Sequence, residues 1–363
     1  MRIGLYGLPC SGKTYILNSI KSLNVFEGSK LLCEYSPKFH SLTKDGKTAI
    51  RKQLAKGLLK KDYFIMDGHY SFGDNVVFTE EDGNLYDVII YLYVHPDIIV
   101  DRMENSEKNE KYLIHNVEQW QNFEVEKLRE YCHIHDKDFY VIDNPVNGCF
   151  LNSDVILEFI DCIVNGFSCK KFAQQCANEI LKHSSGRNIY MTDGDKTLSV
   201  EDTSSLIGYK TNIFDGNFYT GFQSWLHTKQ LLQFMSNNQE ICNNWDVNAI
   251  KVNERIVREL KTNAYIVTSG YSEIWRKISE KWNIPFFSGE CMSADAKYYI
   301  VKYLQKEDKC VIAYGDGMND YYMLRQADVG KLVLKPDGTV SRSLKGKELE
   351  GLIFVHTRKN GED

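Results

Sequence analysis

The stretch I-Y-M-T-D-G-D-K-T-L, residues 189–198, decides the fold of the C-terminal half of the chain. Its short apolar run suits a buried strand that ends at Thr192, and two carboxylates, Asp193 and Asp195, follow at alternate positions. A loop that leaves a strand tip can turn both carboxylates toward one point. Such a point attracts Mg2+, and a free carboxylate there can attack phosphorus to give an aspartyl-phosphate. The alternative is a solvated turn, because Asp and Gly are common turn residues.

Three later stretches supply what this chemistry needs. Residues 264–272, A-Y-I-V-T-S-G-Y-S, form another apolar run that ends in hydroxyls; Lys297 begins an amphipathic stretch; and residues 311–324 read V-I-A-Y-G-D-G-M-N-D-Y-Y-M-L. In this order the four stretches resemble the motifs of haloacid dehalogenase-type phosphatases, and the last is most similar to the phosphoserine phosphatase branch. The resemblance spans roughly residues 188 to 335. It implies a Rossmann-like α/β domain with a doubly wound parallel sheet.

The resemblance also implies a role for each motif residue. Asp193 would be the nucleophile, and Asp195 would be the general acid and then the general base. Thr268 would hold a phosphate oxygen, with Ser269 as the less favoured substitute. Lys297, or failing it Lys302, would neutralise the charge shared by the nucleophile and the phosphoryl oxygens. The resemblance implies Mg2+ held by carboxylates and supported by Asn319; the carboxylates are Asp193, Asp195, Asp316 and Asp320.

Residues 199–262 separate the first two motifs and are too many for a simple loop. Apolar and aromatic content predicts helices within 214–234 and 252–260. This position resembles the family's helical cap, which closes over small substrates. Five aromatic or imidazole side chains of this segment either line a pocket or form the core of the cap: Phe218, Tyr219, Phe222, Trp225 and His227.

Composition limits the class of protein. The 363 residues suggest two domains, and their apolar and charged fractions are ordinary for a globular protein. Met1 leads directly into a strand-like run, and no apolar run has the length of a membrane span. Ten cysteines without a C-x-x-C pair favour free thiols in a reducing, cytoplasmic compartment. A net charge of -5 gives no support to broad nucleic-acid binding.

The N-terminal half begins with a second phosphate motif. Residues 2–20 read R-I-G-L-Y-G-L-P-C-S-G-K-T-Y-I-L-N-S-I, in which a strand-like run enters the P-loop pattern and a helical pattern follows. Backbone N–H groups and the helix N-terminus bind phosphates there, Lys13 reaches the outer phosphates, and Thr14 holds Mg2+. We therefore expect ATP, or another nucleoside triphosphate, at Gly7, Cys10, Ser11, Gly12, Lys13 and Thr14.

Four further strand-like runs alternate with helical stretches and predict a parallel sheet with helices on both faces. They cover Lys30–Cys33, Tyr63–Met66, Val88–Val94 and Phe139–Ile142. Their spacing resembles the nucleoside and nucleotide kinases. On that resemblance Glu34 is the candidate base, Asp67 is a metal-linked or alternative base, and Arg102 steadies the transferring phosphoryl group. A lid over residues 103–122 would add Lys108 and Lys111, although lysine lacks the bidentate fork of the arginine that the family favours.

These observations predict a P-loop kinase-like domain over 1–166, a helical linker over 167–187, and a phosphatase domain over 188–363 with its cap at about 199–262. The predicted function is an ATP-dependent kinase of a small nucleoside-like or nucleotide-like hydroxyl compound, joined to a Mg2+-dependent phosphomonoesterase. Two alternatives stay open. The domain order is similar to that of phage-type polynucleotide kinase-phosphatases, which heal RNA or DNA ends, and the P-loop could instead sense a nucleotide and regulate the phosphatase.

Overall fold

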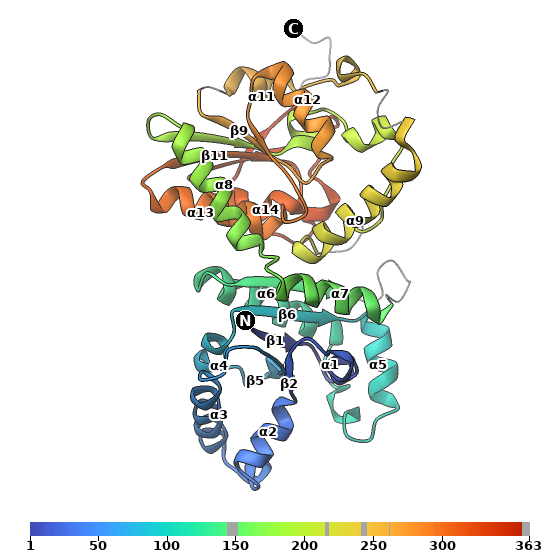
Figure 1. The fold of residues 1–363 in the computed structure, drawn as a ribbon, viewed down its shortest axis with the longest axis vertical. Coiled ribbons are helices and arrows are strands. Elements are labelled where there is room, and N and C mark those ends of the chain that lie inside the picture. The colour runs from blue at the N-terminus through green and yellow to red at the C-terminus, as the bar shows by residue number, and fades with distance from the viewer. Residues whose placement is uncertain (144–151, 215–217, 241–244, 261, 358–363) are drawn as a thin grey trace. The chain divides into compact units, whose positions relative to one another are not determined.

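The computed structural model describes residues 1–143, 152–214, 218–240, 245–260 and 262–357. The chain divides into two compact units, Met1–Phe167 and Ser168–Asp363, each with a sheet flanked by helices (Figure 1). The helix expected as a linker is α8 (Cys169–His183), and it belongs to the second unit. One side of α8 is buried there, and the Tyr265 hydroxyl donates a hydrogen bond to the carbonyl of Ile180 at its end. Residues 168–187 therefore lie within the second compact unit, and Phe167 lies in the first.

The first unit is built on a parallel sheet of five strands in the order β2-β3-β1-β6-β7. The strands are β1 (Arg2–Tyr6), β2 (Asn24–Phe26), β3 (Phe64–Asp67), β6 (Val88–Tyr93) and β7 (Asp138–Asp143). The central strands are buried almost throughout, as continuous apolar runs in a covered parallel sheet require. The order reverses between β1 and β6, so the sheet is doubly wound as predicted.

Seven helices and a small hairpin complete the described part of the first unit. The helices are α1 (Lys13–Ser19), α2 (Gly28–Tyr35), α3 (Lys44–Leu58), α4 (Glu80–Leu85), α5 (Pro96–Glu104), α6 (Val117–Ile134) and α7 (Ser153–Val164). The hairpin pairs β4 (Ser71–Phe72) with β5 (Asn75–Val76), and short helical turns lie at η1 (Phe39–Ser41) and η2 (Glu110–Tyr112).

One predicted strand of the first unit is wrong. Residues Lys30–Cys33 lie in helix α2, and the second strand of the sheet is the shorter β2. Gly28 and Leu32, four positions apart, are the buried residues of α2, which is the spacing of a helix face. The other three predicted strands correspond to β3, β6 and β7.

The second unit has a sheet of six parallel strands in the order β10-β9-β8-β11-β12-β13. They are β8 (Asn188–Thr192), β9 (Ala264–Val267), β10 (Phe286–Phe287), β11 (Cys310–Gly315), β12 (Val329–Val333) and β13 (Ile353–Val355). The main helices besides α8 are α9 (Gly221–Asn237), α11 (Glu254–Glu259), α12 (Ser272–Trp282), α13 (Ala294–Lys306) and α14 (Met318–Gln326). Both units are thus α/β with doubly wound parallel sheets.

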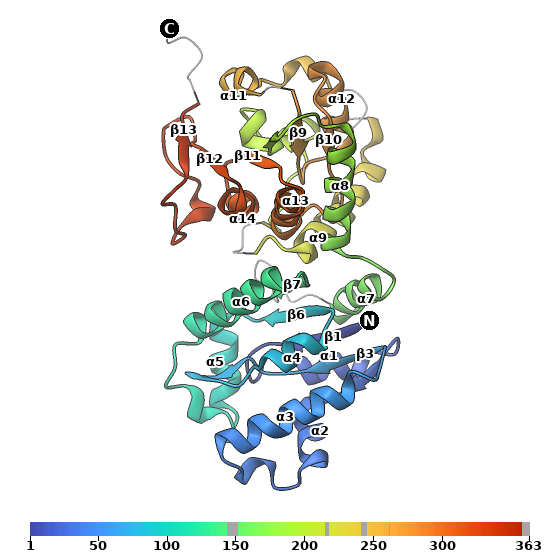
Figure 2. The same ribbon diagram turned by 90° about the vertical axis from the view of Figure 1, so that its left-hand side faces the viewer.

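Helices cover both faces of this second sheet, which Figure 2 shows with α8, α13 and α14 on one face and α11 and α12 on the other. Alternating strand residues explain the two layers. Ile266 packs with Ile274 and Trp275 of α12 in one buried cluster, whereas its neighbour Tyr265 reaches α8. Adjacent strand residues therefore bury their side chains in separate cores.

The segment expected as a cap, residues 199–262, contains η4 (Thr203–Ile207), α9, η5 (Val247–Ala249) and α11 in its described part. Residues 215–217, 241–244 and 261 of this segment lie outside the described residues, so the helical stretch predicted over 214–234 is described at Phe214 and from Phe218 on. A bridge between Ser199 and Val252 closes the base of the segment. The predicted helices correspond to α9 and α11.

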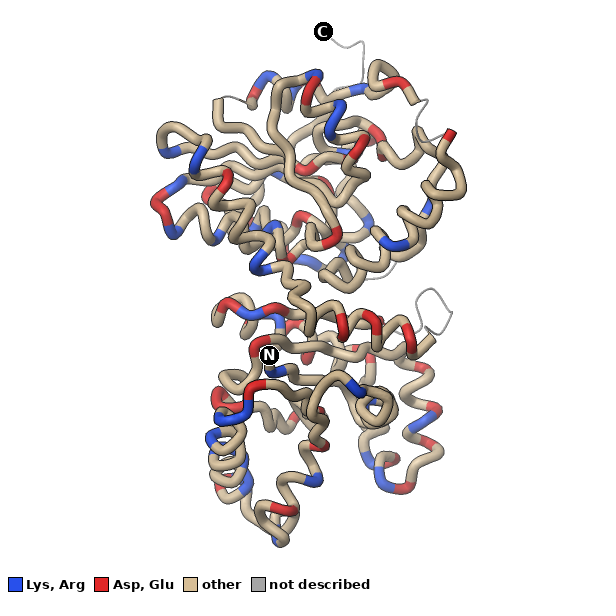
Figure 3. The backbone as a smooth tube through the Cα atoms, viewed as in Figure 1, with Lys and Arg blue, Asp and Glu red and all other residues tan. Residues whose placement is uncertain are grey.

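Among the described residues, no helix combines the length and apolar character needed to cross a bilayer. Eight cysteines of the described residues are free thiols. Acidic and basic residues are interspersed along both units (Figure 3).

Candidate active sites

The first candidate site lies where three strands of the second sheet end. Asp193 follows β8, Thr268 follows β9 and Asp316 follows β11, and β8 pairs in parallel with both of the other strands. Because parallel neighbours end at the same edge, the three side chains meet there. The backbone N–H of Asp193 donates to the carbonyl of Tyr314 at 2.9 Å, which fixes the first loop against β11.

Lys297 is the charged centre of this site. Helix α13 carries it into the core, where its side chain is fully buried, and its ammonium lies 2.6 Å from Oδ1 of Asp193 and 2.7 Å from Oδ1 of Asp320. Burial alone would lower the pKa of Lys297, but the charges of Asp193 and Asp320 outweigh burial and raise it above its ordinary value. Lys297 therefore stays protonated between two carboxylates. Lys302, the alternative, packs near the rings of Tyr298 and Tyr299 instead.

Three carboxylates converge beside this lysine. Oxygen atoms of Asp193, Asp316 and Asp320 lie within 4.8 Å of one another. Burial, and next the charge of Asp320, raises the pKa of Asp193 well above its ordinary range and that of Asp316 to about 7. One ammonium does not offset three acidic groups, so the site favours a further cation. Closely spaced carboxylate oxygens are ligands of the kind that Mg2+ uses.

The carboxylate of Asp195, which was also expected among the metal ligands, lies outside this group of three carboxylates. Its Oδ1 accepts the backbone N–H of Thr203 at 2.6 Å, and its Oδ2 accepts the indole N–H of Trp275 at 3.4 Å. A Cβ on Gly270 would lie 2.4 Å from that Oδ2, so glycine makes room for the carboxylate. Burial, and then the nearby Asp202, raises the pKa of Asp195 to about 6. A carboxyl with this pKa can both give and take a proton near neutral pH.

Thr268 and Ser269 have different surroundings. Thr268 is buried, and its hydroxyl accepts the backbone N–H of Gly270 at 3.0 Å. The Ser269 hydroxyl donates to the carbonyl of Met292 and accepts a hydrogen bond from Nδ2 of Asn319 at 2.9 Å. Ser269 therefore positions Asn319 beside the carboxylates.

A cavity of about 350 Å³ opens over these groups and extends into the cap segment. Of the five cap residues considered from the sequence, Tyr219 and His227 line it, whereas Phe218, Phe222 and Trp225 are buried and do not. Several other lining residues could not be found from the sequence, because they are dispersed along the chain: Asp202, Tyr209, Phe214, Ser341 and Ser343.

The second candidate site is the P-loop between β1 and α1. Gly7, Cys10 and Gly12 all have positive φ, and a Cβ on Gly7 would lie 2.7 Å from the carbonyl oxygen of Leu92. Lys13 is buried, and its ammonium donates to the carbonyls of Gly7 and Leu8 at 2.6 and 2.9 Å. Burial lowers the pKa of Lys13 to about 8, against the opposing effect of Asp67. Thr14 is exposed at the start of α1, where a ligand can reach it.

Two acidic residues end neighbouring strands beside the P-loop. Asp67 ends β3, and its Oδ1 accepts the N–H of Gly28 at the start of α2 with a distance of 2.8 Å. Burial raises the pKa of Asp67, and the charge of Glu27 adds to this rise. Glu27 directly follows β2, which pairs with β3, whereas the predicted base Glu34 is exposed on α2. In the sequence, Glu27 is the acidic residue that follows N-V-F, residues 24–26. This run is too short to be recognised as a strand.

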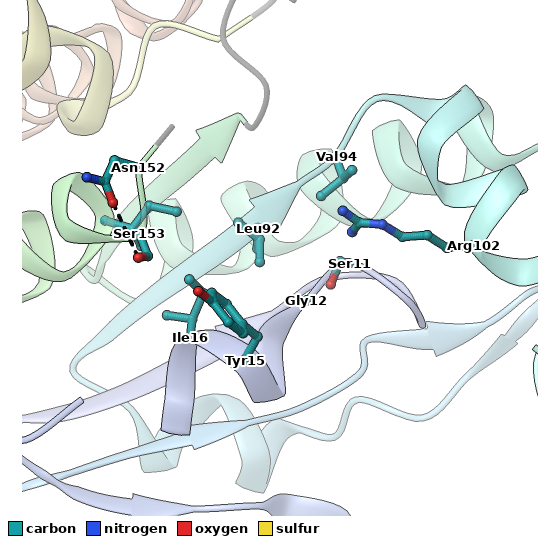
Figure 4. Close-up of a pocket in the computed structure, with 10 residues that line it drawn as sticks. Ser11, Gly12, Tyr15, Ile16, Leu92, Val94, Arg102, Asn152 and Ser153 are labelled. Atoms are coloured by element: carbon teal, nitrogen blue, oxygen red, sulfur yellow. Dashed lines mark hydrogen bonds between the residues drawn. The ribbon is translucent and has the colours of Figure 1, made fainter. Parts of the chain in front are cut away.

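A cavity of about 460 Å³ lies beside the P-loop (Figure 4). Ser11, Tyr15 and Ile16 line it from the loop and α1, and Asn152 and Ser153 line it from the start of α7. Arg102 of α5 extends toward Ser11, and its guanidinium donates to the carbonyl of Cys10 at 3.0 Å.

The expected lid residues 103–122 include the end of α5, the turn η2 and the start of α6. Lys108 and Lys111 are both exposed there, and the ammonium of Lys111 lies 5.0 Å from the ring centre of Tyr112.

Comparisons with known proteins give likenesses to two classes of enzyme. No protein-family model matches the chain, and no significant match is found among curated proteins. Among solved structures, shikimate kinase from Acinetobacter baumannii is 12% identical with a TM-score of 0.33, over 46% of this chain and 95% of that chain. A deoxyadenosine kinase from M. mycoides with bound dCTP is 17% identical with a TM-score of 0.28, over 46% of this chain and 100% of that chain.

A phosphoserine phosphatase in its apo form is 16% identical with a TM-score of 0.29, over 41% of this chain and 86% of that chain. The structural neighbours thus include P-loop kinases and haloacid dehalogenase-type hydrolases, the two classes that the sequence motifs resemble.

Proposed function

We propose that the second unit is a Mg2+-dependent phosphomonoesterase that works through an aspartyl-phosphate. The observation that carries the proposal is the buried Lys297 ammonium between Asp193 and Asp320, with Asp316 beside them. In this proposal a carboxylate oxygen of Asp193 attacks phosphorus, and Lys297 offsets the charge of the phosphoryl oxygens.

The other residues of the site divide the remaining tasks. Asp195 gives its proton to the leaving oxygen and then takes one from the attacking water, which its pKa of about 6 allows. Thr268 binds a phosphoryl oxygen. Asp193, Asp316 and Asp320 would hold Mg2+, which supplies positive charge to the phosphoryl group when bound. These three carboxylates suit a divalent cation because they bring negative charge together in a buried site.

Hydrolysis of p-nitrophenyl phosphate with and without Mg2+ tests this proposal. Asp193→Asn should abolish turnover, because an amide oxygen is a poor nucleophile, and should leave ATP binding by the first unit intact. Asp337→Asn, in an exposed turn, is the matched control and should keep wild-type turnover. Normal turnover by Asp193→Asn would remove the nucleophile assignment.

We propose that the first unit is an ATP-dependent kinase of a small nucleoside-like or nucleotide-like hydroxyl compound. The P-loop would hold the phosphates, with Lys13 turning from the loop carbonyls toward them and Thr14 binding Mg2+. The cavity beside Tyr15 and Arg102 would take the base and sugar of ATP. Glu27 or Asp67 would accept the proton of the acceptor hydroxyl, since Asp67 ends β3, which pairs with β1, and Glu27 follows β2, which pairs with β3.

A panel of nucleosides, nucleotides and labelled RNA or DNA ends, each incubated with ATP, tests the acceptor. We expect transfer to small acceptors; transfer to polymer ends alone would favour the polynucleotide alternative. Glu27→Gln should lower kcat by about 10²-fold or more if Glu27 is the base, whereas the exposed Glu34→Gln should not. If the wild type binds ATP through Lys13 but phosphorylates none of these acceptors, the P-loop is a nucleotide sensor.

The free thiols also favour a reducing compartment, and we propose the cytoplasm as the location.

A further inference from the structure

The phosphatase cavity has one wall of aromatic rings. Tyr209, Phe214, Tyr219 and His227, all from the cap segment, line it together. Phe214 and Tyr219 are nearly parallel, with ring centres 5.5 Å apart and an angle of 12°. The His227 ring lies 5.2 Å from Phe214 and 5.6 Å from Tyr209. We call these four residues the aromatic wall.

Phe214 and Tyr219 of the aromatic wall differ from the core of the cap. Phe222 and Trp225, on the same helix as His227, are 0% and 5% exposed and do not line the cavity. Phe214 and Tyr219 are only half-buried and keep ring surface toward the cavity. The Tyr219 hydroxyl donates a hydrogen bond to the carbonyl of Phe214 at 2.9 Å, and this bond ties Tyr219 to the Phe214 backbone. Rings that face an open cavity are available to stack on a ligand.

His227 adds a polar group to this wall. Its side chain is 9% exposed and lines the cavity. Burial lowers the pKa of His227 to about 4, against the effect of the nearby Asp202 carboxylate, so the imidazole is neutral at pH 7. A neutral imidazole offers one donor and one acceptor. The polar edge of a ligand in the cavity can therefore bind the His227 ring as a donor or as an acceptor.

We propose that the aromatic wall binds the planar nitrogen heterocycle of a phosphate monoester, so that the substrate class of the phosphatase is the nucleoside monophosphates. This inference rests on the phosphatase function proposed above. The phosphate would lie at Asp193 and Lys297, and the heterocycle would stack on Phe214 and Tyr219. His227 would bind the polar edge of the ring, for which a hydrocarbon ring has no counterpart. A cavity of about 350 Å³ suits a ligand of this size.

Three groups of substrate separate the possibilities. They are nucleoside 5'- and 3'-monophosphates, phenyl phosphate and phosphotyrosine as carbocyclic rings, and glycerol phosphate and phosphoserine without rings. We expect kcat/KM for nucleoside monophosphates to exceed that for glycerol phosphate by tenfold or more. Stacking on one aromatic side chain is worth about 1–3 kcal/mol per base, which corresponds to about 5- to 150-fold.

Two variants test the individual contacts. Phe214→Ala should lower the ratio of kcat/KM between nucleoside monophosphates and glycerol phosphate by about tenfold, mainly through KM. His227→Phe keeps a ring in the wall and should reduce the preference for nucleoside monophosphates over phenyl phosphate. The control is Leu232→Ala, since Leu232 is 58% exposed on the same helix, and it should keep both ratios.

Equal kcat/KM for nucleoside monophosphates and glycerol phosphate would overturn the inference while leaving the phosphatase function standing. The same holds if Phe214→Ala leaves the ratio unchanged. Calorimetric titration of a nucleoside monophosphate and of glycerol phosphate into the Asp193→Asn protein gives a readout that needs no turnover. Tighter binding of the nucleoside monophosphate supports the aromatic wall even if hydrolysis fails, and equal binding refutes it.

Discussion

At the residue scale, two lysines of one helix give the sharpest prediction for the phosphatase site. Lys297→Met removes the buried ammonium but keeps most of the side-chain volume, so three carboxylates lose their cation. We expect kcat for p-nitrophenyl phosphate to fall by about 10²- to 10³-fold or more. Lys302→Met, near the rings of Tyr298 and Tyr299, should retain activity. Comparable activity of the two variants, with circular dichroism showing both folded, would exclude the role of Lys297.

His227 gives a prediction for stability against pH. Its pKa of about 4 in the folded protein is below the ordinary 6.5, so the unfolded chain binds more protons between these values. Stability therefore falls as the pH drops from 6.5 toward 4, by up to about 3 kcal/mol from this residue. Urea unfolding at about pH 7 and about pH 4.5 measures the effect. The His227→Phe variant should lose less stability than the wild type between these two pH values; an equal loss would mean that His227 titrates normally.

The residues proposed as nucleophile and base illustrate how far single residues could be predicted from the sequence. Asp193, Lys297 and Asp320 stand in contiguous motifs after clear strands, and the structure brings them within hydrogen-bonding distance. The side-chain direction of Asp195 depends on Thr203 and Trp275, eight and eighty positions away, and no local pattern reports it. Glu27 follows β2, a strand of three residues at the edge of the sheet. Such a short, partly exposed strand has too few apolar residues to show a pattern in the sequence.

At the element scale, strand length decided which elements could be predicted. The runs before Asp193 and Asp316 are buried strands of five and six residues, and their apolar runs stand out in the sequence. The run L-L-C within α2 is equally apolar but belongs to a helix of eight residues, and periodicity cannot separate a short strand from such a helix. Helix α8 was predicted from the sequence, but its packing within the second unit was not. Packing between elements that are distant in the chain leaves no local sequence pattern.

A close approach of helix α14 to strand β12 gives a prediction about these elements. A Cβ on Gly330 would lie 2.3 Å from the carbonyl oxygen of Leu324, so Gly330→Ala must push α14 away from the sheet. We expect a loss of about 1–3 kcal/mol in the second unit and weaker phosphatase activity, because α14 carries Asp320.

Gly57→Ala is the control for this prediction. Nothing lies within 4 Å of the added Cβ, and Gly57 is inside helix α3 of the first unit. Alanine should therefore stabilise that unit by up to about 1 kcal/mol. Thermal unfolding with separate readouts for ATP binding and phosphatase activity distinguishes the two effects. A stable Gly330→Ala protein with full activity would show that the close packing is not required.

At the scale of the whole molecule, the chain passes from the first compact unit to the second at one peptide bond, between Phe167 and Ser168. Phe167 packs its ring against Tyr140 and Phe159 of the first unit. Ser168, the next residue, caps helix α8 of the second unit by accepting the N–H of Lys171 at 3.1 Å. Each side of this single peptide bond is therefore anchored within its own unit.

We expect residues 1–167 and 168–363, produced separately, each to fold and to keep the activity proposed for it. The cut retains the Phe167 contacts in the first fragment and the Ser168 cap in the second, so neither fragment loses a core element. Equilibrium unfolding of the fragments, with ATP binding and p-nitrophenyl phosphate hydrolysis as readouts, measures this. A cut after Ser184 is the control, because it moves α8 to the first fragment and takes its buried face, with Ala173, Cys176 and Ile180, away from the second sheet. If both cuts give equally stable second fragments, α8 contributes nothing to that unit; if the first cut unfolds either fragment, the units depend on each other for folding.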